Sequence, residues 1–297
     1  MIEVSIIIIN FNTFQLTCNC LTSVIEKTRE VNYEIIVVDN ASIECDPSRF
    51  KDLFPEIHLI KSDVNLGFSK GNNLGIRHAK GDYILLLNSD TVLVNNAVKV
   101  ACERIKSDSG IGVLTAKLVS ENGSIQHSVH RFPSIKLELL ELFRLPFFMK
   151  KRFKQTYFLS EFADYDHEII GDWVWGTFFL FPRQILTKLE NGRLSENFFM
   201  YYEDLEWCYH IKKIGYRVLY CPNAVVIHYT SSSTKTSEQL KIKNQSLTNN
   251  FHSVLMEILG EKLTRIYYFV KGLKHLSFFY TSQNSRAAIN YFKLIFK

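Results

Sequence analysis

The feature that most constrains the fold is a run of β-branched residues near the start of the chain. Residues 4–9 read Val-Ser-Ile-Ile-Ile-Ile and lead directly into the polar sequence Asn10-Phe11-Asn12. An apolar strand without polar alternation needs cover on both faces, which is typical of a parallel sheet between two layers of helices. Three further strands are predicted at 34–38, 57–61 and 82–87.

Helical patterns separate these strands. Residues 13–28 and a segment that ends at His78 are predicted helices. The alternation predicts an α/β fold with a doubly wound, mostly parallel sheet of Rossmann-like type. Ligands bind such sheets beyond the carboxyl ends of the strands. Later strands are expected at 112–119, 174–181, 217–220 and 224–227, and a later helix at 204–214.

Length and charge divide the chain unevenly. At roughly 100–200 residues per domain, 297 residues allow one large domain and an appendage. We predict a domain over 1–235, in two halves at 1–120 and 121–235, with a Ser/Thr-rich linker at 230–237 and a helical extension at 236–297. The net charge of +5 arises in the tail, because residues 235–297 hold ten Lys or Arg and three acids.

The sequence shows no sign of export. The six cysteines form no C-x-x-C pair, and the N-terminus lacks the basic region and cleavage site of a signal peptide. Apolar runs fall short of the ~20 residues that span a bilayer. We therefore expect a cytoplasmic protein with free thiols.

The basic, aromatic segments 254–297 and 136–154 have two possible interpretations. Their composition is that of an interfacial helix on an anionic membrane, which would place the protein peripherally at the inner face of the cell membrane. The same composition also suits a helix that packs on the domain with solvated charges. No nucleic-acid partner is expected, because no recognised binding module accompanies the basic residues.

A strand that ends in Asn88-Ser89-Asp90 is the first candidate for chemistry. Hard divalent cations prefer oxygen ligands and share them with substrate phosphates, so a carboxylate on a rigid strand end can hold such an ion. The same three residues are also typical of a plain turn. His228 follows the apolar run 224–227, where a ligand role and a structural role are equally open.

Two other strand ends carry polar groups. Asp39 ends the second strand, where a carboxylate can bind a base edge or ribose, or cap a turn. Residues 65–75 form a predicted loop with three glycines and several side-chain amides. The glycines permit close backbone approach, and the amides can bind phosphate or sugar. Neither the Walker spacing nor the dinucleotide-binding spacing is present.

The acidic pair Glu203-Asp204 opens a predicted helix after the aromatic run 198–202. Carboxylates at this place gain from the helix dipole, so capping explains them. A partly desolvated carboxylate can also remove a proton from an attacking hydroxyl. In the least patterned region, Trp175 and Gly176 are candidates for sugar stacking, with a buried strand as the alternative.

Together these segments resemble the family 2 glycosyltransferases, which are inverting enzymes with the GT-A fold. The matching motifs run in family order over about residues 3–233, and they are closest to the bacterial surface-polysaccharide branch that includes rhamnosyltransferases. The resemblance implies a nucleoside-diphosphate sugar donor (UDP-, dTDP- or GDP-linked), a saccharide or lipid-linked acceptor, and Mn²⁺ or Mg²⁺. The motifs are Ile-Ile-Asn10-Phe-Asn12, Val-Val-Asp39-Asn-Ala-Ser42, Asn65-Leu-Gly-Phe68, Gly71-Asn-Asn-Leu-Gly75, Leu-Leu-Asn88-Ser-Asp90-Thr, Phe-Phe-Met-Tyr201-Tyr-Glu203-Asp204-Leu-Glu206 and His228.

The resemblance also implies roles. Residues 1–120 would bind the nucleotide sugar, and Asp90 and His228 would bind the metal. The family's first metal-binding acid is replaced by Asn88, which leaves fewer charges to hold the ion. The implied nucleotide-sugar-binding residues are Asn10, Asn12, Asp39, Ser42, Asn65, Gly67, Phe68, Gly71, Asn72, Asn88, Ser89 and Asp90.

Residues 121–235 would bind the acceptor, with Trp175, Gly176 and Tyr201 in contact with it. Asp204 would act as the general base, supported by Glu203. Two other classes stay open. A nucleotide-sugar nucleotidyltransferase would need a Gly-rich basic signature that residues 1–30 lack. A non-catalytic GT-A-like binding protein would have kept the fold alone.

Overall fold

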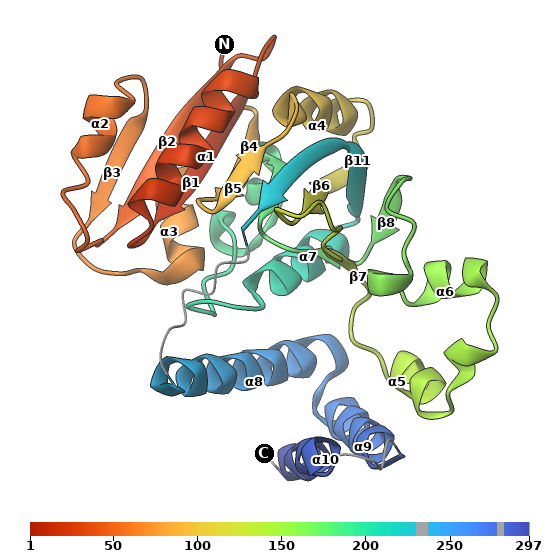
Figure 1. Ribbon diagram of the computed structural model, residues 1–297. Coiled ribbons are helices and arrows are strands. Elements are labelled where there is room, and N and C mark those ends of the chain that lie inside the picture. The colour runs from red at the N-terminus through yellow and green to blue at the C-terminus, as the bar shows by residue number, and fades with distance from the viewer. Residues whose placement is uncertain (230–236, 278–281, 297) are drawn as a thin grey trace.

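The computed structural model describes residues 1–229, 237–277 and 282–296. The predicted linker at 230–237, apart from its last residue, and the predicted boundary after residue 235 lie outside the described residues. The fold centres on a mixed, mostly parallel sheet in the order β3-β2-β1-β4-β10-β6-β11-β5, with β8 beside β11 (Figure 1). Its strands are β1 Val4–Asn10, β2 Tyr33–Asn40, β3 His58–Ser62, β4 Tyr83–Asn88, β5 Thr91–Leu93, β6 Ile111–Val119, β8 Ile169–Gly171, β10 Phe178–Pro182 and β11 Arg217–His228.

Helices cover both faces of this sheet, as the apolar strands predict. Successive residues of a strand point to opposite faces, so Ile6 of β1 belongs to the buried cluster that includes α1 and α4, and Ile7 to the cluster that includes α3 and α7. A small second sheet pairs β7 Val129–His130 with β9 Trp173–Val174. The helices of the body are α1 Phe14–Lys27, α2 Arg49–Leu53, α3 Gly67–Ile76, α4 Ala97–Lys106, α5 Ile135–Leu142, α6 Lys151–Tyr157 and α7 Glu203–Lys213, with short 3₁₀ turns η1 Leu145–Phe147, η2 Ser160–Phe162, η3 Arg183–Lys188 and η4 Glu190–Gly192.

The Gly-rich segment corrects one prediction. Residues 67–76 form helix α3 and not a loop. Its glycines allow this helix to lie close to the sheet. A Cβ on Gly75 would come 2.5 Å from Ile7, and one on Gly71 would come 2.8 Å from Ile9. The close approach of helix to strand therefore outweighs the low helix propensity of glycine.

Three later predictions also change. The single strand expected at 174–181 is interrupted, because Trp175 and Gly176 lie in a turn between β9 and β10. The two strands expected at 217–220 and 224–227 are one strand, β11, with a register shift between Cys221 and Val225. The irregular region 121–168 contains α5 and α6.

The tail is helical, as predicted, in α8 Ser237–Leu259, α9 Glu261–Ser277 and α10 Ser282–Leu294. It is joined to the middle of the chain by a buried cluster between α5 and α9. Tyr267 Oη donates to Glu138 Oε1 (2.8 Å), and Lys274 Nζ contacts both Glu138 and Glu141. Among the described residues, no helix is both long enough and apolar enough to cross a bilayer.

Candidate active site

Polar side chains gather at one edge of the sheet, where the parallel strands end. In the register of the sheet, Asn10 lies beside Asp39, and Ile9 lies beside Asn88. The carboxyl ends of β1, β2 and β4 therefore meet at this edge (Figure 1). The strand-end clusters expected from the sequence are neighbours in space.

Asp39 is held by a hydrogen-bond network at this edge. Asn10 Nδ2 donates to Asp39 Oδ1 (2.7 Å), and Ser42 N donates to Oδ2 (3.1 Å). Asp39 is only 2% exposed. Asn10 also donates to Ser42 Oγ (2.9 Å), and Asn12 Oδ1 accepts from Ile43 N (2.9 Å). The geometry makes Asn10 a group that positions Asp39, whose carboxylate is almost fully buried.

Asn40, which the sequence reasoning left out of the site, fixes the start of α3. Its Oδ1 accepts from Leu66 N (2.8 Å), while its Nδ2 donates to Asn65 Oδ1 (3.0 Å) and Gly67 O (3.1 Å). Its position directly after Asp39, at the end of β2, was the available signal. Asn72 is buried and donates to Phe68 O (2.9 Å), so it braces this helix start from within.

The start of α3 contacts the segment that leads into α7. Phe68 N donates to Phe199 O (2.7 Å), and the Phe68 ring stacks on Trp207 with centroids 6.0 Å apart. Gly67 has a φ of +75°, and a Cβ there would lie 2.3 Å from the Phe199 carbonyl oxygen. Glycine is therefore required at 67 by both its backbone conformation and its surroundings.

Asp204 lies in the first turn of α7 with its carboxylate held by two main-chain amides. Gly176 N donates to Oδ2 (3.0 Å) and Leu205 N donates to Oδ1 (2.9 Å). Burial raises the pKa of Asp204 to about 6, although both hydrogen bonds lower it. A carboxylate fixed in this way and shielded from water can accept a proton near neutral pH.

Glu203 differs from its neighbour. It is buried, and its Oε2 has no hydrogen-bond partner among the described residues. Burial, and secondarily the charge of Asp204, raise the pKa of Glu203 to about 8. Burial raises the pKa of Glu203 more than that of Asp204, which favours the form of the pair in which Glu203 keeps a proton and Asp204 is ionised.

The turn before this pair is strained. Tyr201 and Tyr202 have φ values of 76° and 69°, a left-handed conformation that bulky residues rarely adopt. Asn250 of α8 donates to the carbonyls of Met200 (2.9 Å) and Tyr201 (3.0 Å) and so stabilises the turn. Strain of this kind persists only where surrounding contacts enforce it, and it concentrates at functional sites.

Asp90 and His228 come together across the β5–β11 pair. His228 Nε2 lies 3.5 Å from Asp90 Oδ1. Gln126 Nε2 donates to the His228 carbonyl (2.9 Å), which orients its amide so that Oε1 accepts from His228 Nδ1 (2.7 Å). With Nδ1 protonated, Nε2 carries the lone pair that a metal ligand needs. Gln126 lies in the unpatterned region and was missed.

These groups fit a divalent cation. Asp90 offers a carboxylate oxygen and His228 a ring nitrogen, a donor set that suits Mn²⁺. The buried Oδ1 of Asn88 has no hydrogen-bond partner among the described residues, so an oxygen on the same turn is left for an ion or a substrate. Ser89 Oγ lies 3.2 Å from Thr13 Oγ1, which ties the turn to the start of α1.

Trp175 and Gly176 link the two parts of the site. The Trp175 ring lies edge-on to His228 with centroids 6.5 Å apart, and the Gly176 amide reaches Asp204. A Cβ on Gly176 would lie 3.3 Å from the Phe68 ring. The turn between β9 and β10 therefore lies between the candidate metal ligands and the candidate base.

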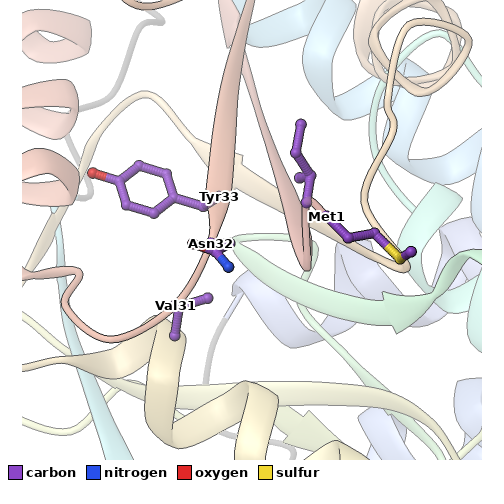
Figure 2. Close-up of a pocket in the computed structure, with 5 residues that line it drawn as sticks. Met1, Val31, Asn32 and Tyr33 are labelled. Atoms are coloured by element: carbon purple, nitrogen blue, oxygen red, sulfur yellow. The ribbon is translucent and has the colours of Figure 1, made fainter.

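Two other features lie apart from this edge. Glu206, His210 and Glu257 hold possible ligand atoms within 4.8 Å of one another, and His210 Nε2 lies 2.6 Å from Glu257 Oε1. We interpret this group as a polar link between α7 and α8. A pocket of about 440 Å³ opens at the opposite end of β1 and β2 (Figure 2). No carboxylate lines it, since its lining residues are Met1, Ile2, Val31, Asn32 and Tyr33.

Solved structures identify the fold class. The mannosyltransferase PcManGT from Pyrobaculum calidifontis, in complex with GDP-Man and Mn²⁺, matches 99% of this chain and 81% of its own, with a TM-score of 0.58 and 15% identity. GalNAc-T7 with UDP, GalNAc and Mn²⁺ matches 99% of this chain and 56% of its own, with a TM-score of 0.62 and 15% identity. The fold is GT-A, as the sequence predicted.

Family membership follows from the sequence. The model of glycosyl transferase family 2 matches residues 5–170, more than half of the chain, which therefore belongs to this family. The protein is a glycosyltransferase. Membership decides against the nucleotidyltransferase alternative.

Three curated relatives agree with this membership. The low-salt glycan biosynthesis hexosyltransferase Agl10 of Haloferax volcanii is 25% identical over 90% of this chain and 80% of its own. The rhamnosyltransferase WbbL of Escherichia coli is 24% identical over 69% and 76%. The N-acetylglucosaminyl-diphospho-decaprenol L-rhamnosyltransferase of Mycobacterium tuberculosis is 22% identical over 67% of each chain. The two rhamnosyltransferases agree with the predicted branch.

Proposed function

We propose that the protein transfers a sugar, with inversion, from a nucleoside-diphosphate sugar to a saccharide or lipid-linked acceptor in cell-surface glycan biosynthesis. One observation carries the proposal: the Asp204 carboxylate is held by two main-chain amides beside the donor-side residue Phe68. The named substrates of the relatives support it, because one acts on a decaprenol-linked sugar and another in glycan biosynthesis.

In the proposed step, Asp204 accepts the proton of an acceptor hydroxyl. The acceptor oxygen forms a bond to the anomeric carbon, and the bond from that carbon to the diphosphate oxygen breaks. The nucleoside diphosphate leaves with the bonding electrons. Attack opposite the leaving group inverts the anomeric carbon. The larger upward shift of the pKa of Glu203 favours Asp204 as the ionised member of the pair.

The donor would lie along the carboxyl edge of β1, β2 and β4. Asp39 would bind the base or ribose, and the residues around Asn65–Phe68 would face the sugar. Asp90 and His228 would hold the divalent ion, with Asn88 Oδ1 available to the ion or the donor. The ion supplies positive charge that neutralises the leaving diphosphate. Mn²⁺ in both solved neighbours supports this assignment.

Acceptor binding would involve Trp175, Gly176 and Tyr201, because the first two lie between His228 and Asp204 and the third begins the strained turn. A lipid-linked acceptor would be presented at the inner face of the cell membrane, so we place the protein in the cytoplasm at that surface.

A donor-hydrolysis screen tests the proposal. The full chain is incubated with UDP-, GDP- and dTDP-sugars and Mn²⁺, and nucleoside diphosphate release is measured. We expect one donor class to be hydrolysed, with loss of release in Asp90→Ala. No release from any donor would contradict the proposal. With a sugar acceptor in hand, the anomeric configuration of the product, read by NMR, tests inversion.

A further inference from the structure

Residues 143–157 form a projection whose apolar side chains face solvent. This segment, the basic-aromatic projection, runs from the end of α5 through η1 to the end of α6. Phe147 and Phe148 are each 85% exposed, and Phe143 and Phe153 are also exposed. Figure 1 shows α5 and α6 beside the body, away from the central sheet. Soluble monomers rarely leave so many neighbouring aromatic side chains uncovered, which marks this surface as a contact site.

The same segment carries only positive charge. It contains Arg144, Lys150, Lys151, Arg152 and Lys154 and no acidic residue. Lys150, Lys151 and Arg152 are exposed, and none of the three has an ion-pair partner among the described residues. Aromatic side chains between solvated lysines are the composition of a surface that enters the headgroup region of an anionic bilayer.

In the tail, by contrast, several basic and aromatic side chains of α9 are buried in contacts with the rest of the protein. Lys271 and Lys274 of α9 contact Glu138, and Tyr267 and Tyr268 of the same helix are buried. These four groups of α9 could reach a membrane surface only by leaving their partners. The projection needs no such rearrangement.

A cavity of about 300 Å³ draws its lining from the segment after α6 and from residues around the start of α7. Phe158 and Phe162, which follow α6, line it together with Tyr202 and Leu205. The last two residues flank the Glu203-Asp204 pair. An amphiphilic acceptor whose lipid lies in a bilayer beneath the projection would therefore meet a cavity whose lining includes the neighbours of Asp204.

We propose that the basic-aromatic projection docks on an anionic lipid bilayer and sets the cavity against the membrane surface. The charge of the segment selects this occupant. A second copy of the chain would bring the same uncompensated positive charge to the contact, which opposes self-association. The link from membrane to acceptor rests on the proposed function, whereas the docking itself does not.

Vesicle co-sedimentation of the full chain tests the docking. The probes are vesicles of phosphatidylcholine alone and of phosphatidylcholine with phosphatidylglycerol, at low and high salt. One variant, Phe147→Ser/Phe148→Ser, removes the apolar tip, and a second, Lys150→Glu/Lys151→Glu/Arg152→Glu, reverses three charges. Two matched controls make the same changes elsewhere on exposed residues: Leu53→Ser/Val64→Ser, and Lys27→Glu/Lys80→Glu/Lys213→Glu.

We expect the wild type to bind only the anionic vesicles, and less at high salt. Because each basic residue near an anionic surface contributes about fivefold in binding, the charge-reversal variant should lose at least tenfold, as should the Phe variant. The matched controls should lose less than threefold. Wild-type protein that stays in the supernatant, or equal losses in the controls, would overturn the proposal. Donor hydrolysis of each variant is measured in parallel and should be unchanged. Vesicle binding without hydrolysis would contradict only the proposed function, and hydrolysis without vesicle binding only the docking.

Discussion

Gln126 binds His228 through both ends of its amide, with Nε2 on the main-chain carbonyl and Oε1 on the ring nitrogen Nδ1. The two residues are 102 positions apart in the chain. This double contact sets the tautomer and the orientation of the imidazole, and so turns Nε2 toward Asp90.

Replacing Gln126 with leucine should therefore weaken metal use and leave the fold intact. We expect the Mn²⁺ concentration for half-maximal donor hydrolysis to rise roughly 10- to 100-fold, as for other groups that orient a metal ligand. Ser120→Ala, which removes only a second acceptor of the Gln126 amide, is the control. An unchanged Mn²⁺ dependence in Gln126→Leu would refute the positioning role.

Asp204→Asn should lower sugar transfer by about 10²- to 10⁴-fold, the usual contribution of a general base. The amide keeps the size of the side chain and one acceptor oxygen, which can accept from either Gly176 N or Leu205 N, and it loses the other of these two hydrogen bonds. Binding of the nucleoside diphosphate, measured by calorimetry, should change little. Asp166→Asn, which removes a surface partner of Lys117, should keep full activity. Near-normal transfer by Asp204→Asn would remove this residue from the role.

The pH profile should report the raised pKa of Asp204. Burial raises this pKa to about 6, and only the ionised carboxylate can accept a proton. The value of kcat/KM should therefore fall about tenfold per pH unit below pH 6 and level off above it. A profile that stays flat down to pH 4.5 would show that the base titrates elsewhere.

Glu203 makes a separate prediction about stability. Burial raises its folded-state pKa to about 8, against 4.5 for the free side chain. Between these values the folded protein binds more protons than the unfolded chain, so stability falls as pH rises through this window. Glu203→Gln should be more stable than the wild type by roughly 4 kcal/mol at pH 8, because each unit of the pKa shift is worth about 1.4 kcal/mol, and similar to it at pH 4.5. Urea unfolding at both pH values measures the difference, with the exposed Glu26→Gln as the control.

Gly67→Ala tests the contact between α3 and the segment before α7. The substitution adds left-handed strain of roughly 1–2 kcal/mol and a clash 2.3 Å from Phe199 O. Gly123→Ala is matched to it, because φ is +80° there and nothing lies within 4 Å of the added Cβ. Gly67→Ala should lower the free energy of unfolding by more than the control does and should raise KM for the donor. Equal losses in both variants would show that the contact is not tight.

The strand ends were predictable because each follows an apolar run that indicates a buried strand. Asn10, Asp39, Asn88 and His228 all terminate such runs, and the sheet brings them to one edge. The helix α3 was not predictable from propensity, because Gly71 and Gly75 favour a loop until the close approach of Ile9 and Ile7 is known.

The groups that support the site were harder to find. Gln126 follows no periodic pattern, and its contact with His228 depends on a pairing of distant segments that local sequence does not encode. The roles of Asp204 and Glu203 were inferred from family resemblance, whereas their unequal pKa values depend on burial, on the charge of Asp204 beside Glu203 and on the main-chain amides that bind Asp204.

The buried cluster of Glu138 with Tyr267 and Lys274 makes the packing of α5 depend on α9. If α9 were removed, Glu138 would be left as an unpaired carboxylate in an apolar setting, an arrangement that costs several kcal/mol in proteins. Chimeras that exchange C-terminal segments between members of this family should therefore exchange residues 135–142 and 261–277 together. Substitutions in one of these two segments should therefore be accompanied by compensating substitutions in the other.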